Sequence, residues 1–180
     1  MDVTLIRQED GTYALCWPGN RVTCAVGRGG VRLDKREGDG ATPVGIFPFR
    51  RAFYRPDRLV PPFTGLPLDG VERDDGWCDD QAHPDYNRPV KLPFAASHEV
   101  MWMDEDIYDL VLVPGHNDAP PVPGLGSAVF VHLARPGFPG TAGCIALDRP
   151  SMLALLAVLQ PGDHLVVPAD AVGDYAGGAS

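Results

Sequence analysis

Basic residues are in short supply in this sequence. Its 180 residues include 15 lysines and arginines against 24 aspartates and glutamates, a formal net charge of −9 at pH 7. A chain this acidic gains no affinity from a phosphate backbone, so we exclude nucleic-acid binding, and the same charge opposes docking on anionic lipid. A cationic or zwitterionic substrate suits this charge better.

Long hydrophobic runs are also missing. The longest, residues 152–159, is far shorter than the roughly 20 residues that a membrane-spanning helix needs. Residues 1–15 carry an acid at position 2 and lack a basic start and an apolar core, so no secretory leader is visible. We expect no membrane insertion. If the sequence is complete and unprocessed, the protein is cytoplasmic; a removed leader or another export route would place it elsewhere.

Cysteine is rare, and the four cysteines form no CxxC pair. Cys78 and His83 alone do not make a zinc site, so we expect neither a metal nor another cofactor. Cys16 and Cys24 flank a predicted hairpin turn and could face each other on paired strands. We favour two reduced thiols there, because a disulfide needs an oxidising compartment.

Glycine (21) and proline (19) together exceed a fifth of the chain, which favours loops and short strands. The predicted strands are β-rich runs at residues 3–8, 12–17, 21–27, 44–54, 99–103, 108–117, 127–134 and 163–167. One helix is predicted at about 149–160, with Asp148 as its N-cap and Pro150 in its first turn. The predicted fold is mostly β, a barrel-like or sandwich-like sheet with one main helix packed on it.

Residues 1–180 are predicted to form a single domain, without internal repeats, in which about 55–97 are an irregular loop insertion. Tyr86 and Asn87 lie in the aromatic and polar part of this insertion, a composition typical of a binding rim. A packed loop without a binding role explains the same residues equally well.

Two residues with catalytic potential follow each other closely. His132 lies within an apolar strand, and a loop rich in proline and glycine leads from it to Cys144. If the loop brings the thiol beside the imidazole, the pair can act as nucleophile and general base. Gly143 would let backbone amides approach an oxyanion. Taken alone, these residues fit a core histidine and a buried thiol at least as well.

Two sequence blocks resemble the L,D-transpeptidase (YkuD-type) catalytic domain. "VFVHLARPGFPGTAGCIAL" is similar to the family's active-site block, a histidine after a strand followed by Ser/Thr-His-Gly-Cys, and "ATPVGIFPF" (41–49) is similar to an upstream block. The order and rough spacing of the blocks agree, and the resemblance covers about residues 21–167. It favours the YkuD β-fold and a catalytic Cys144.

The resemblance implies peptidoglycan cross-linking. Cys144 would attack a carbonyl of a donor stem peptide to form a thioester, with His132 as general base. Backbone amides near Gly143 would form the oxyanion hole, and the diaminopimelate side-chain amine of a second stem would resolve the acyl-enzyme. Thr141 takes the Ser/Thr position and would orient the loop or the substrate. Such a substrate implies the periplasm or cell envelope, and we expect a monomer.

The chain departs from the common motif at two positions, because Ala142 replaces the second histidine and Ala146 the usual Arg/Asn. His116 could replace that histidine from its own loop, and Arg135 could pair with a substrate carboxylate; a turn residue and a solvated side chain are the alternatives. The chain resembles an atypical proteobacterial branch, some members of which form 1→3 bonds through the stem's first L-alanine instead of 3→3 bonds. Donor position therefore stays open.

Two other functions remain. A cysteine hydrolase, a carboxypeptidase or amidase, would use the same thioester with water as acceptor. An inactive peptidoglycan-binding module would need neither Cys144 nor His132.

Overall fold

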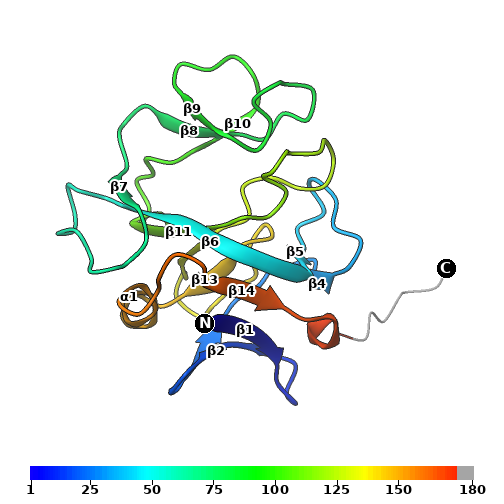
Figure 1. Cartoon of the computed structure of the whole chain (residues 1–180). Helices are drawn as coiled ribbons and strands as arrows, with labels where there is room; N and C mark the ends of the chain where they lie inside the picture. Colours follow the sequence, from blue (N-terminus) through cyan, green and yellow to red (C-terminus); the bar gives the residue numbers. More distant parts are fainter. Residues whose placement is uncertain (174–180) are drawn as a thin grey trace.

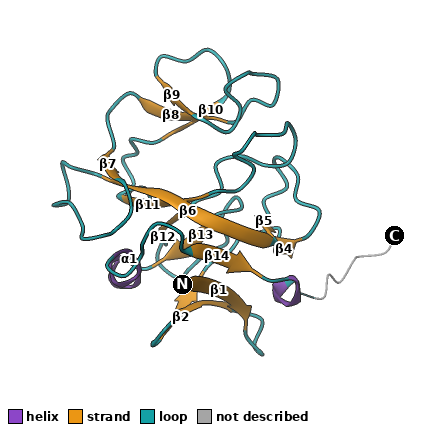
Figure 2. Cartoon of the chain, in the orientation of Figure 1, coloured by secondary structure: helices purple, strands orange, loops and turns teal. Residues whose placement is uncertain are grey.

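The computed structural model describes residues 1–173 and confirms a mostly β fold with one main helix (Figure 1; Figure 2). Its elements in chain order are β1 (Asp2–Arg7), β2 (Tyr13–Trp17), β3 (Asn20–Cys24), β4 (Val31–Arg32), β5 (Thr42–Pro43), β6 (Gly45–Tyr54), β7 (Leu68–Gly70), β8 (Asp75–Cys78), β9 (Pro89–Lys91), β10 (His98–Val100), β11 (Leu110–Pro114), β12 (Val131–Leu133), β13 (Ile145–Leu147), α1 (Arg149–Leu156), β14 (His164–Val167) and the 3₁₀ helix η1 (Ala169–Ala171). No helix within residues 1–173 has the length and apolarity to cross a membrane.

The main sheet runs in the order β13-β12-β11-β6-β14-β1-β2-β3, with β7 also paired to β6. Its two ends meet where the chain leaves β3. Ala25 and Ala146 exchange two backbone hydrogen bonds of 2.9 Å, which joins this segment to β13. The sheet is therefore nearly closed and barrel-like, and few of its edges stay unpaired.

Alternating residues of the strands fill the barrel. Val3 and Leu5 of β1 are fully buried, as are most apolar side chains of β11 and β13. Helix α1 packs on this core through Met152, Leu155 and Leu156. Each such side chain contributes about 1.5–3 kcal/mol when it leaves water, so the barrel has the larger part of the folding free energy.

The predicted start of the helix is confirmed, and its predicted end is wrong. The Asp148 carboxylate accepts a hydrogen bond from Ser151 N at 2.7 Å, as an N-cap does. The helix ends at Leu156 rather than near 160. In the following turn Asp163 Oδ2 accepts from Gln160 N at 2.8 Å, and Pro161 has no N–H with which to continue the helix.

A second, smaller sheet, β10-β8-β9, lies above β6 and β11 in the view of Figure 1. We call residues 71–109, which include this sheet and its loops, the cap. Its apolar side chains form a separate core with barrel residues; Trp77 and Tyr108 both pack edge-on against Phe130. Residues 55–97, predicted to be irregular, thus contain β7, β8 and β9, each only three or four residues long.

The predicted strand at 99–103 is wrong in extent, since β10 ends at Val100. The chain bends at Trp102, whose ring lies between two guanidinium groups, 3.8 Å from that of Arg55 and 4.8 Å from that of Arg73. This stacking fixes the indole outside the sheet.

The predicted face-to-face position of Cys16 and Cys24 is also wrong. A two-residue turn sets the register of β2 and β3, so Cys16 lies opposite Arg21 and Cys24 opposite Tyr13. Both thiols are free.

Candidate active site

His132 lies on β12 with its imidazole away from the barrel core. Its neighbours Val131 and Leu133 belong to that core, as the alternation of a strand requires. His132 is 7% exposed, and its Nδ1 lies 2.9 Å from the carbonyl oxygen of Leu133. Since a carbonyl only accepts, Nδ1 has the proton and Nε2 is left as the basic nitrogen. Burial lowers the pKa of His132, so the ring is neutral near pH 7.

Cys144 directly precedes β13, which runs parallel to β12. Ile145 pairs with Val131 and Ala146 with His132, so the thiol lies on the same face as the His132 ring, two residues before the strand partner of His132. Its Sγ donates to Ala128 O at 3.2 Å and accepts from Phe130 N at 3.3 Å. Burial raises the pKa of the thiol to about 12. The resting nucleophile is therefore a neutral thiol that needs a base.

Two threonines hold the loop before Cys144. Thr141 Oγ1 donates to Cys144 O at 2.6 Å and accepts from Gly143 N at 3.1 Å. Thr42, from the upstream sequence block, donates to Gly143 O at 2.9 Å. Gly143 has a φ of +134°, and a Cβ there would lie 2.9 Å from Ala41 O, so only glycine fits. The two sequence blocks thus meet at this loop.

The backbone amides of the loop differ in their availability. Gly143 N–H is already bonded to Thr141, whereas Cys144 N–H has no hydrogen-bond partner among residues 1–173. Of the two amides considered for the oxyanion hole, that of Cys144 is the one free to receive an oxyanion.

His132 and Cys144 line one cavity of about 380 Å³. Its walls have charges of both signs. Lys35 lies near Gly143, whereas Glu37, Asp79 and Glu99 provide carboxylates. Burial raises the pKa of Glu99, which accepts a hydrogen bond from the Tyr108 hydroxyl at 3.2 Å. The pocket therefore offers a nucleophile, a base and charged groups that fit a zwitterionic ligand.

The model of the L,D-transpeptidase (YkuD) catalytic domain matches residues 3–167, nearly the whole chain. This chain belongs to that family. The family acts on peptidoglycan stem peptides in the cell wall, so membership supports an enzyme of the transpeptidase type. No curated protein and no solved structure matches the chain.

The structure does not bring every predicted binding residue of this L,D-transpeptidase domain to the cavity. Thr141 and Arg135 line it, but Arg135 is half exposed and paired with Glu105 at 2.8 Å. Tyr86, Asn87 and His116 do not line it. His116 Nε2 instead lies 3.0 Å from Leu125 O.

Asn87 and Tyr86 brace the loops around the cavity. Asn87 Oδ1 accepts from Trp77 Nε1 at 2.9 Å and from Ala128 N at 3.1 Å. The Tyr86 hydroxyl donates to Glu37 and accepts from Gly126 N. Asn87 thereby positions Ala128, whose carbonyl accepts from the Cys144 thiol.

The sequence analysis did not single out Thr42, Lys35 or the wall carboxylates Asp79 and Glu99. Thr42 was visible as the threonine of the upstream block. Lys35 lies in a charged loop whose composition is typical of a solvated segment, yet it is only 8% exposed.

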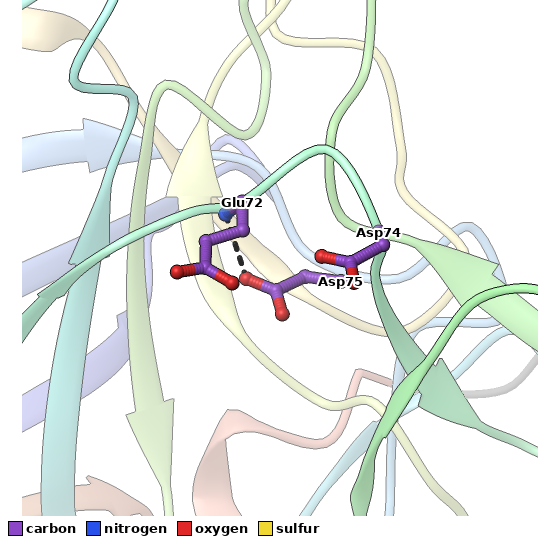
Figure 3. Close-up of side chains that lie close together, drawn as sticks. All are labelled: Glu72, Asp74 and Asp75. Carbon is purple, nitrogen blue, oxygen red and sulfur yellow. Dashed lines mark hydrogen bonds between the residues drawn. The ribbon is translucent and has the colours of Figure 1, made fainter.

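A cluster of carboxylate side chains that could bind a metal ion lies in the cap, outside the lining of the catalytic cavity. Among the described residues, Glu72, Asp74 and Asp75 bring carboxylates together on one turn (Figure 3). The Lys91 ammonium lies 2.6, 3.0 and 2.7 Å from these three side chains. A lysine thus already provides their countercharge.

Proposed function

We propose that this L,D-transpeptidase domain cross-links peptidoglycan stem peptides through a thioester on Cys144. The observation that supports this most is the placement of the Cys144 thiol and the His132 imidazole on one face of paired parallel strands, in one cavity. This is the minimal pair for cysteine acyl transfer.

Acylation begins with transfer of the thiol proton to Nε2 of His132. Sγ then attacks the donor carbonyl, and the Cys144 N–H stabilises the oxyanion. Collapse of the tetrahedral intermediate breaks the C–N bond, and His132 returns its proton to the leaving amine. A thioester remains on Cys144, and the part of the donor peptide that follows the attacked carbonyl departs with the amine: the terminal residue for a third-position donor, the rest of the stem for a first L-alanine donor.

Transfer reverses these roles. The diaminopimelate side-chain amine of a second stem attacks the thioester carbonyl, His132 takes the amine's proton, and the thiol leaves with that proton. The carboxylate wall suits the acceptor, because Glu99 and Asp79 can accept amine hydrogen bonds. Asp79 Oδ1 is buried and has no partner among the described groups.

Thr141 orients the loop of the nucleophile in this proposal, and Arg135 is placed to bind a substrate carboxylate once it leaves Glu105. Asn87, Tyr86 and His116 act as supports of the cavity wall. The peptidoglycan substrate places the reaction at the cell envelope.

A hydrolase is the second candidate function, because the same thioester reacts with water and part of the cavity wall is charged. An inactive module is disfavoured by the complete His132–Cys144 pair. The cavity lining does not select between donors that use the third-position carbonyl and donors that use the first L-alanine, so both bonds are tested.

Incubation with defined muropeptides and mass-spectrometric mapping of the products tests the proposal. We expect dimers, and the fragmentation pattern distinguishes 3→3 from 1→3 bonds. Trimmed monomers alone would replace the transferase with a hydrolase, and unchanged substrate with both donor types would contradict the proposal.

A further inference from the structure

The loop between β4 and β5 places a buried cation, Lys35, at the candidate active site. Lys35 lines the catalytic cavity and is 8% exposed, which is unusual for a lysine. Its Nζ lies 3.8 Å from the position that a Cβ at Gly143 would occupy. Its Cε would lie 2.9 Å from a Cβ at Gly126. Two glycines with positive φ therefore leave the space through which this side chain reaches the nucleophile loop.

Hydrogen bonds hold the ammonium in place. Lys35 Nζ donates to Arg36 O at 2.8 Å and to the Asp39 carboxylate. That carboxylate also accepts from Arg36 N and Ala41 N, at 2.8 Å each. Because Asp39 is shared with two backbone amides, it anchors the lysine and only partly neutralises its charge.

The reaction needs such a cation. The Cys144 thiol is buried among apolar side chains, and Glu99, which lines the same cavity, disfavours its negative charge further. The positive charge of Lys35 has the opposite effect on the pKa of Cys144 and favours the thiolate. A partly buried ammonium beside the nucleophile loop stabilises an anion there far more than an ammonium in water would.

We propose that Lys35 is the electrostatic partner of Cys144, whose ammonium stabilises the negative charge that forms on the sulfur and then on the substrate oxygen. It provides this charge from outside the active-site block, in which Ala142 stands at the motif's second histidine position. The proposal rests on Cys144 as the nucleophile of the proposed function. It does not depend on which peptide the enzyme joins.

Alkylation of Cys144 by iodoacetamide tests this without any peptidoglycan substrate. The rate at Cys144, mapped by mass spectrometry between pH 6 and 10, reports the thiolate population. We expect Lys35→Met to slow the reaction at pH 8 by about tenfold, which corresponds to a thiol pKa one unit higher. Lys35→Arg should stay within about threefold of the wild type, since the charge is kept.

Lys91 is the only other lysine of the chain, and Lys91→Met is the matched control, expected to leave the Cys144 profile unchanged. Asp39→Asn removes the countercharge while keeping an acceptor for Lys35, so it should speed alkylation by about threefold. A loss of packing alone would not produce this opposite sign.

Identical pH profiles for folded Lys35→Met and wild type would overturn the proposal. If Lys35→Met does not fold, the Asp39→Asn result decides, and a rate equal to or below that of the wild type contradicts the proposal. A failed muropeptide assay with these alkylation shifts intact would remove the proposed substrate and leave the role of Lys35 standing.

Discussion

The barrel and the cap are stabilised in different ways. The barrel buries side chains of a continuous nine-stranded sheet that nearly closes through the bonds between Ala25 and Ala146, so its stability comes from one large apolar core. The cap has strands of three or four residues and depends on particular side chains such as Trp77 and Asn87. The candidate active site lies between them, because the barrel positions His132 and Cys144 and the cap contributes part of the cavity wall, including Asp79, Glu99 and Tyr108.

This difference explains what the sequence could predict. The barrel strands, the Asp148 N-cap and the choice of His132 and Cys144 as candidate residues follow from periodicity, capping chemistry and motif, and the structure places those two side chains in one cavity. The cap strands do not, since the bond from Trp77 to Asn87 and the stacking at Trp102 join residues that local patterns cannot connect. Lys35 was missed for the same reason, because only the folded loop shows that it is buried.

The largest expected effect on activity comes from removing the imidazole of His132, which the barrel positions. His132→Ala should slow acylation of Cys144 by a carbapenem by roughly 10²–10⁴-fold, the usual share of a general base. The barrel core on the other face of β12 should keep the fold intact. Stopped-flow or mass-spectrometric rates measure this, with His164→Ala on β14 as the control. A near-normal rate would remove His132 from the mechanism.

The next effect concerns the stability of the cap, which depends on the side chain of Asn87. Asn87→Ala leaves the Trp77 Nε1–H and the Ala128 N–H without their acceptor, which should lower the free energy of unfolding by about 1–3 kcal/mol. It should also loosen the Ala128 carbonyl beside Cys144 and reduce the acylation rate. Urea titration gives the stability, and Asn20→Ala at the start of β3 is the control. Unchanged stability would show that the cap does not depend on this residue.

The buried environment of His132, between the barrel and the cap, sets the pH dependence of acylation. Because burial lowers the pKa of His132, its neutral form persists to lower pH, and acylation should fall with a midpoint below about 6.5, the ordinary value for histidine. The sign follows directly, since a protonated imidazole cannot take the thiol proton. Rates between pH 4.5 and 8 locate the midpoint. A midpoint above 6.5 would show that a charged form is favoured in the site.

The smallest expected effect concerns the acidic turn of the cap. Lys91 already pairs with Glu72, Asp74 and Asp75, and the proposed acyl transfer uses only protein groups, a thiol, an imidazole, a backbone amide and an ammonium, and no metal. EDTA treatment should therefore leave the acylation rate unchanged. Loss of activity that added metal restores would contradict a mechanism based only on the thiol.

Trapping the acyl-enzyme tests the central claim most directly. The wild-type chain is incubated with a carbapenem or a donor muropeptide, and its intact mass and modified peptide are compared with those of Cys144→Ala. We predict a single adduct on Cys144 that is absent from Cys144→Ala, although Cys16, Cys24 and Cys78 remain in both proteins. An adduct elsewhere, or one that persists in Cys144→Ala, would contradict the account.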